Sequence, residues 1–204
     1  MSDPHVDPLI DRIGPVVAEI AERHDVPGVA VGVVRGGEQA IVGVGVTNAE
    51  YPLPVDGTTR FQVGSISKTI TSAATMLLVG DGLIELDAPA ATYLADLDLR
   101  GDAGRGAGPT GLDLAAVTIE QLLSHRAGID GDHFLVHGGA GGLAALRNAR
   151  RLFEPGEGYS YSNAGFSLAG AVIESASGMP YDVFVRTRMF EPLGMTSCTF
   201  RADD

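Results

Sequence analysis

Hydrophobic residues at the start of the chain recur with the period of a helix. Asp7-Pro8 is typical of a helix N-terminus, because proline fits the first helical position, and this helix is expected to end before Pro27. One face of the helix is marked by Ile10, Ile13, Val17, Ile20 and His24. The spacing of these residues predicts an amphipathic helix.

A β-hairpin is predicted directly after this helix. Residues 28–35 and 38–46 are apolar runs of strand length, and Gly36-Gly37 between them supplies a tight turn. Both strands carry apolar residues on both faces, so we expect a sheet that is covered on each side. Two strands alone are only marginally stable, and the rest of the sequence offers few further strands.

From residue 61 onwards the pattern is mostly helical. A helix follows Ser65, with Gly80-Asp81-Gly82 as its expected end, and a short helix is expected to end near Leu94. Thr118 and Gln121 fit a capping box that opens the next helix. Later helices are predicted over residues 119–125, 142–153, 164–176 and 181–190. A little β structure followed by many helices indicates an α+β fold.

Composition and charge narrow the class of protein. The 204 residues are 45% hydrophobic and 20% charged, which is ordinary for a globular protein, and the formal net charge is -12. This charge argues against nucleic acid and anionic membrane surfaces as partners, although it can also simply keep a protein soluble. The single cysteine, Cys198, allows no internal disulfide and is expected to be buried. Without a secretory signal or a membrane-spanning apolar run, we expect a cytoplasmic protein.

The first candidate for chemistry is the pair Ser65 and Lys68. Residues i and i+3 share a helical face, so this hydroxyl and this amine can meet. A serine hydroxyl is a weak nucleophile until a base removes its proton, and an amine can be that base when desolvation lowers its pKa. Lys68 is the only lysine among 14 basic residues. The alternative is that Ser65 caps a helix and Lys68 is there by chance.

The second candidate is the segment Tyr161-Ser162-Asn163. A tyrosine hydroxyl beside a Ser-Lys pair can relay a proton to a leaving group, and an asparagine side chain can hold a substrate amide. The alternative is that Tyr161 packs in the core and that Asn163 caps the following helix.

Two other patterns carry less weight. Residues 101–106 are glycine-rich but lack the ending and the preceding strand of a phosphate loop. His133 and His137 could face one metal ion, yet no acidic ligand accompanies them in the zinc-protease pattern, so an exposed or locally bonded role is favoured. The arginines Arg147, Arg150 and Arg151 favour a solvated helix face over an anion site.

Taken together, these motifs resemble those of the penicillin-recognising serine hydrolases, which comprise class C β-lactamases, DD-peptidases and related esterases. Ser65-Ile66-Ser67-Lys68 stands within a Phe-x-x-Gly-Ser-x-Ser-Lys pattern, and Tyr161-Ser162-Asn163 follows about a hundred residues later. Residues 122–129 are similar to a Leu-Leu-x-His-x-Ser-Gly-Leu motif, and residues 191–195 to a Pro-Leu-Gly-Met motif. The likeness covers nearly all of residues 7–200.

The resemblance implies a role for each matched residue. Ser65 would be the acylated nucleophile and Lys68 the amine that activates it, with Tyr161 as acid/base partner and Asn163 as a substrate-orienting amide. The Ser65 backbone N–H would form half of an oxyanion hole. The resemblance implies a small ester or amide as the substrate, and no metal or organic cofactor. Because exported β-lactamases and DD-peptidases meet their substrates outside the cytoplasm and the sequence shows no secretory signal, we expect an esterase-like substrate first and a β-lactam-related one second.

The family's third motif, Lys/His-Thr/Ser-Gly on a strand, has no match in this chain. We therefore expect residues 1–204 to be a partial domain of the β-lactamase/transpeptidase-like fold that lacks its C-terminal sheet strands. Residues 7–60 would form the helix and hairpin of the sheet region, and residues 61–204 the mostly helical region. Such a chain is expected to be impaired in catalysis and to self-associate or pair with the missing segment. The alternative is an incomplete fragment that acts as a binding or partner-complemented module.

Overall fold

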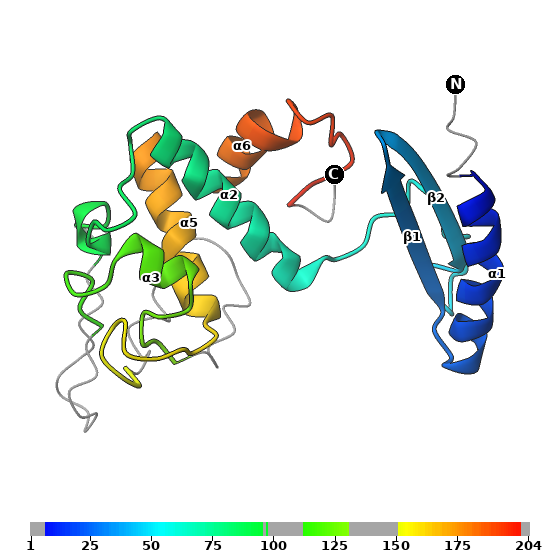
Figure 1. The fold of residues 1–204 in the computed structure, drawn as a ribbon, viewed down its shortest axis with the longest axis horizontal. Helices are drawn as coiled ribbons and strands as arrows, with labels where there is room; N and C mark the ends of the chain where they lie inside the picture. Colours follow the sequence, from blue (N-terminus) through cyan, green and yellow to red (C-terminus); the bar gives the residue numbers. More distant parts are fainter. Residues whose placement is uncertain (1–6, 96, 98–111, 131–150, 201–204) are drawn as a thin grey trace. The chain divides into compact units, whose positions relative to one another are not determined.

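The structure is a computed structural model that describes residues 7–95, 97, 112–130 and 151–200 (Figure 1). The chain forms two compact units, Met1–Gln62 and Val63–Asp204. The predictions made for residues 101–106, for His133 and His137, and for most of the helix over 142–153 lie outside the described residues.

The first unit consists of a helix and a two-stranded antiparallel sheet. Helix α1 (Asp7–Arg23) is followed by β1 (Gly28–Arg35) and β2 (Glu38–Gly45). The register runs from Gly28 opposite Gly45 to Arg35 opposite Glu38, so the connection is the two-residue turn Gly36-Gly37. Both turn glycines have positive φ, 59° and 89°, which explains why glycine occupies these positions. The predicted helix and hairpin are confirmed.

The two faces of this sheet differ in exposure. Alternate side chains are half-buried, namely Val29, Val31, Val33, Ala40, Val42 and Val44. Helix α1 packs on this side, because a Cβ added at Gly14 would lie 3.5 Å from Val42. On the other face Val34 and Ile41 are 72% and 53% exposed. The expectation of a sheet covered on each side is met only in part: α1 covers one face, and on the other face the backbone of Val55 lies over Gly43 while Val34 and Ile41 stay exposed.

The inner face of α1 also differs from the expected one. Ile20 is exposed, whereas Ala21 is buried. A helix of 3.6 residues per turn shifts its facing positions along its length, so a single residue can replace its neighbour on the packed stripe.

The second unit is built around helix α5 (Asn163–Ser177), which contacts α2 (Ser67–Gly80), α3 (Ile119–Leu123) and α6 (Tyr181–Val185) (Figure 1). A short turn of 3-10 helix, η1 (Gly64–Ile66), lies directly before α2. A second one, η2 (Ala90–Thr92), replaces the short helix that was expected to end near Leu94. The side chains that fill the core include Leu78, Ile84, Ile119, Leu122, Leu168, Ile173 and Phe184, all at most 2% exposed.

Local signals explain most helix ends in this unit. Thr118 and Gln121 form the predicted capping box, with both reciprocal hydrogen bonds present. Helix α5 ends at Gly178, which has a φ of 68°. Helix α3, however, ends at Leu123 rather than at His125, because His125 adopts a left-handed backbone with a φ of 60°.

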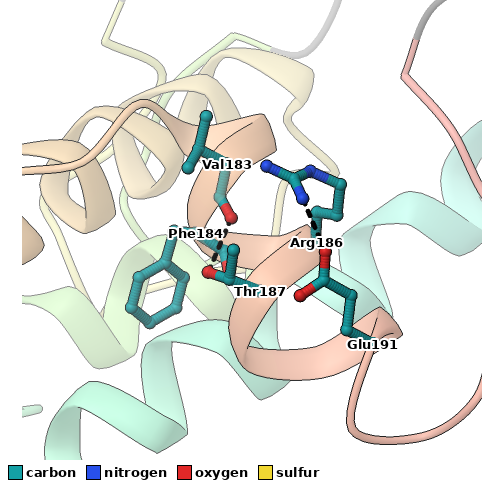
Figure 2. A network of polar contacts seen from close by, with 5 residues as sticks. All are labelled: Val183, Phe184, Arg186, Thr187 and Glu191. Carbon is teal, nitrogen blue, oxygen red and sulfur yellow. Dashed lines mark hydrogen bonds and ion pairs between the residues drawn. The ribbon is translucent and has the colours of Figure 1, made fainter.

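The last predicted helix, over residues 181–190, changes its winding within this range. Helix α6 continues as the π-helical turn η4 (Arg186–Phe190). At this junction the Thr187 hydroxyl donates to the carbonyls of Val183 and Phe184, at 2.8 and 3.3 Å (Figure 2). The guanidinium of Arg186 pairs with Glu191 at 2.5 Å. The Thr187 hydrogen bonds thus lie at the start of η4, and the Arg186–Glu191 ion pair joins its first residue to the residue that follows it.

Two further expectations are corrected. Arg151 forms an isolated β-bridge with Ile129, so a helix does not continue to residue 153. Cys198 is exposed rather than buried, and so are all the residues from 191 to 197 that lead to it. No helix in the described part of the chain is long and apolar enough to cross a membrane. The cytoplasmic location and the self-association stay predictions.

Candidate active site

Ser65 lies in the 3-10 turn η1, directly before the start of α2. Gly64 before it has a φ of 53°, a conformation that glycine adopts without steric cost. Ser67-Lys68 then open α2, which places Lys68 one turn after Ser65. The Lys68 ammonium donates to Ser65 Oγ at 3.1 Å, so the two residues meet as their spacing predicted.

Tyr161 reaches the same oxygen from the segment that precedes α5. Its hydroxyl donates to Ser65 Oγ at 2.7 Å, across 96 positions of sequence. The side chain is 43% exposed, so the alternative in which Tyr161 packs in the core is wrong. The Ser65 oxygen makes no capping hydrogen bond to η1 or α2, so the alternative in which Ser65 only caps a helix is wrong. Ser65, Lys68 and Tyr161 thus converge on one atom.

Asn163 is the first residue of α5, and its side chain turns towards α2. Asn163 Oδ1 accepts a hydrogen bond from Lys68 Nζ at 2.6 Å. The cap of α5 is instead Ser162, whose hydroxyl accepts from the Gly165 N–H at 3.0 Å. The alternative of Asn163 as a cap is therefore wrong, and its amide is free to bind the lysine.

The charge of Lys68 dominates the electrostatics of the site. Its Nζ lies 4.7 Å from the ring centre of Tyr161 and 5.7 Å from that of Phe166, which are cation–π distances. Hydrogen bonding to Lys68, and then to Ser65, lowers the pKa of Tyr161, because both contacts favour the phenolate. The site therefore holds two groups, an amine and a phenol, that can exchange a proton with the serine hydroxyl.

His125 also belongs to this cluster, although the sequence analysis gave it no role. Its Nδ1 accepts a hydrogen bond from the Ser162 backbone N–H at 3.0 Å. Its ring centre lies 4.4 Å from that of Tyr161 and 5.1 Å from that of Phe166. Burial, and secondly the charge of Lys68, lowers the pKa of His125. The motif at residues 122–129 pointed to this residue, but its contact with Tyr161 depends on the tertiary fold.

Two loop segments hold this cluster together. Residues 125–129 and 151–160 run side by side, with hydrogen bonds from Leu152 N–H to the Gly128 carbonyl and from Gly156 N–H to the Arg126 carbonyl, both at 2.8 Å. Gly128 has a φ of 72°, and a Cβ there would lie 2.2 Å from the Phe153 carbonyl oxygen. Glycine is required here because the two backbones approach so closely.

All four predicted site residues thus come together within the second unit, from the start of α2 and the start of α5. Among the described residues, no three histidine, cysteine or acidic side chains gather in a way that could hold a metal ion. A serine flanked by an amine and a phenol is suited to acyl transfer by nucleophilic catalysis.

Comparison with known proteins agrees with this chemistry. The sequence model of the beta-lactamase family matches residues 14–204. Penicillin-binding protein 4 of Amycolatopsis lactamdurans is 33% identical over 179 residues, which are 84% of this chain and 44% of that protein. Esterase EstB of Burkholderia gladioli is 32% identical over 176 residues, covering 76% of this chain and 42% of the esterase.

The solved structures show the same fold. A class C beta-lactamase superimposes over 100% of this chain and 55% of its own, with a TM-score of 0.80 and 22% identity. The fold is therefore the α+β fold of β-lactamases and penicillin-binding proteins, as the sequence analysis expected. The chain spans less than half the length of the two relatives named above.

Proposed function

Because the chain belongs to the beta-lactamase family, we propose that it is a serine hydrolase in which Ser65 takes up the acyl group of an ester or amide. One observation carries this proposal. The Ser65 oxygen lies within hydrogen-bond distance of both Tyr161, at 2.7 Å, and Lys68, at 3.1 Å. Two groups able to move protons at one nucleophile are what an acyl-transfer reaction needs.

The first half of the reaction forms an acyl-enzyme. Ser65 Oγ attacks the carbonyl carbon while its proton passes to Tyr161, which takes part in this step as the phenolate that its hydrogen bonds to Lys68 and Ser65 favour. The carbonyl oxygen becomes an oxyanion, and the backbone N–H of Ser65, in the turn η1 directly before α2, donates to it. When the tetrahedral intermediate collapses, the bond to the leaving group breaks, and the leaving alcohol or amine takes the proton from Tyr161.

The second half releases the acid. Water attacks the carbonyl carbon of the acyl-enzyme and gives its proton to the Tyr161–Lys68 pair. The ester bond to Ser65 then breaks, and Ser65 Oγ takes a proton back. Throughout both halves Asn163 holds Lys68 through the 2.6 Å hydrogen bond, and the amide nitrogen of Asn163 can donate to the substrate.

The leaving group distinguishes the two substrate classes. An activated aryl ester leaves without being protonated, whereas an amide nitrogen must gain a proton before its bond breaks. Because the Tyr161 hydroxyl points directly at Ser65 Oγ, it is placed to protonate a nitrogen there. We assign the substrate to small esters and amides, with a β-lactam, itself a cyclic amide, as the second choice.

The test is a comparison of three substrates with the same chain. An aryl ester, an open-chain amide and a penicillin are incubated separately with the wild-type chain and with Ser65→Ala, and product release is followed by absorbance. Product release that occurs with the wild type but not with Ser65→Ala supports the proposal. The substrate that is turned over fastest shows whether the chain prefers esters, amides or β-lactams. Equal rates for the wild type and Ser65→Ala with all three substrates would refute it.

A further inference from the structure

His125 contacts the segment around Tyr161 at two successive points. Its backbone carbonyl accepts from the Ser160 N–H at 2.9 Å, and its Nδ1 accepts from the Ser162 N–H at 3.0 Å. These two amides stand on either side of Tyr161. One residue therefore fixes the backbone before and after the tyrosine.

The His125 side chain also limits the tyrosine itself. The two ring centres are 4.4 Å apart with the planes tilted by 33°, and Phe166 of α5 lies 5.1 Å from the imidazole. The imidazole thus packs between the phenol ring and Phe166. With its backbone and its ring both held, Tyr161 points its hydroxyl at Ser65 Oγ.

This double contact depends on an uncommon backbone conformation. His125 has a φ of 60°, which non-glycine residues seldom adopt because of steric strain. The conformation ends α3 and turns the imidazole towards Ser162. Strain held at a site of this kind is retained where the surrounding structure requires it.

The second hydrogen bond exists only in one protonation state of His125. Nδ1 can accept from the Ser162 N–H only if it carries no proton, so the neutral ring must hold its proton on Nε2. The imidazolium form would place a second donor against that N–H. Within the described part of the chain, the ring is faced by the Lys68 cation from α2, by Tyr159 and Tyr161 from the loop, and by Phe166 from α5. None of these supplies a carboxylate that would favour the charged form.

We propose that His125 is a positioning residue that aims the Tyr161 hydroxyl at Ser65 as long as its imidazole is neutral. The inference rests on the proposed hydrolase function for its effect on rate, but the geometry of Tyr161 can be measured independently. Protonation of His125 removes one of the two backbone hydrogen bonds, loosens Tyr161 and slows acylation of Ser65. The site therefore has a built-in loss of activity at acid pH.

The test uses two variants that differ in the acceptor. In His125→Asn the amide oxygen stands where Nδ1 stood, two bonds from Cβ, and can accept the same hydrogen bond. The amide does not titrate, and asparagine adopts the left-handed backbone conformation readily. In His125→Phe the ring remains but the acceptor is lost. Acylation of Ser65 by an activated ester should fall about 10- to 100-fold in His125→Phe and recover most of its rate in His125→Asn.

A second readout separates positioning from mere folding. The pKa of Tyr161, followed by NMR of ¹³C-labelled tyrosine, should rise towards its ordinary value in His125→Phe and stay low in His125→Asn. If His125 only supports the fold, both variants lose thermal stability while the pKa of Tyr161 in the folded protein stays as in the wild type. That result would overturn the proposal.

The wild-type chain alone gives a third readout, which does not depend on any variant folding. The Tyr161 ring resonance should shift with the same midpoint pH as the His125 imidazole resonance, and neutral His125 should carry its proton on Nε2. A Tyr161 resonance that ignores the His125 titration contradicts the proposal. If the wild type is never acylated, the hydrolase function fails, yet the two NMR measurements still decide the role of His125.

Discussion

Lys68 Nζ and Asn163 Oδ1 are 2.6 Å apart and join the first turn of α2 to the first residue of α5. These two helices pack against each other over their buried faces. The position of the lysine amine is therefore set from two sides, by its own helix and by the packing of α5. Its distance from Ser65 follows from this packing and not from the Ser-x-x-Lys spacing alone.

Asn163→Ala should release Lys68 from one of its anchors. The amine then samples positions away from Ser65, and acylation by an activated ester is expected to slow by roughly 10- to 100-fold. Ser167→Ala, one turn further along α5, is the matched control because it leaves the Asn163 side chain in place. Stopped incubations followed by mass spectrometry give both rates. Equal rates for the two variants would show that the anchor is dispensable.

Tyr161→Phe should separate amide from ester chemistry. The change removes the 2.7 Å hydrogen bond to Ser65 but keeps the ring against His125. Loss of an acid/base group typically costs about 10²–10⁴-fold in rate. We expect the larger loss with an amide, whose leaving nitrogen must be protonated, and a smaller loss with an aryl ester.

Tyr159→Phe, two residues away and also exposed, is the control for this change. Rates with both substrates are measured by product absorbance, and thermal unfolding checks that neither variant loses its fold. An equal loss with ester and amide would remove Tyr161 from the protonation of the leaving group.

The tyrosines should ionise in a defined order. Hydrogen bonding to Lys68 and Ser65 lowers the pKa of Tyr161, whereas burial raises the pKa of Tyr181, which outweighs its hydrogen bond to Thr71. As the pH rises, Tyr161 therefore loses its proton at a lower pH than an ordinary tyrosine, and Tyr181 loses its proton at a higher pH. Ultraviolet titration of the wild type should show an early step that Tyr161→Phe lacks and a late step that Tyr181→Phe lacks. An early step that persists in Tyr161→Phe contradicts the electrostatics described for the site.

Gly128→Ala should destabilise the second unit far more than the same change at Gly178. Both glycines have positive φ, 72° and 68°, so an alanine at either position costs about 1–2 kcal/mol of strain. At Gly128 the new Cβ would also meet the Phe153 carbonyl oxygen, whereas at Gly178 nothing lies within 4 Å. The two free energies of unfolding, measured in urea, should differ by several kcal/mol by analogy with other severe backbone clashes. Similar values would mean that the 125–129 and 151–160 segments can separate at little cost.

Local features of the fold could be predicted from the sequence. The Gly36-Gly37 turn, the Thr118–Gln121 capping box and the Gly178 helix end all depend on residues within a few positions of one another. Short-range chemistry decides such features, so they are visible in the residue order. The Ser65–Lys68 contact belongs to this class only in part, since one helical turn brings the two side chains within reach but the bond to Asn163 also holds the amine in place.

Features that depend on distant residues could not be predicted in this way. The capping role went to Ser162 rather than Asn163, because Lys68, 95 positions earlier, binds the Asn163 amide. The part played by His125 required its left-handed backbone and the 151–160 segment beside it. The exposure of Val34 and Ile41 likewise depends on which segments pack against the β1–β2 sheet, and the apolar pattern of the two strands does not reveal this.

The most direct test of the central claim is the intact mass of the chain before and after incubation with an activated ester. Peptide mapping then locates any adduct in the wild type, in Ser65→Ala and in Ser67→Ala, a matched control two residues away on the same turn. The account predicts one added acyl group on Ser65 in the wild type and in Ser67→Ala, and none in Ser65→Ala. An adduct that survives in Ser65→Ala, or no adduct in any of the three, would contradict the assignment of Ser65 as the nucleophile.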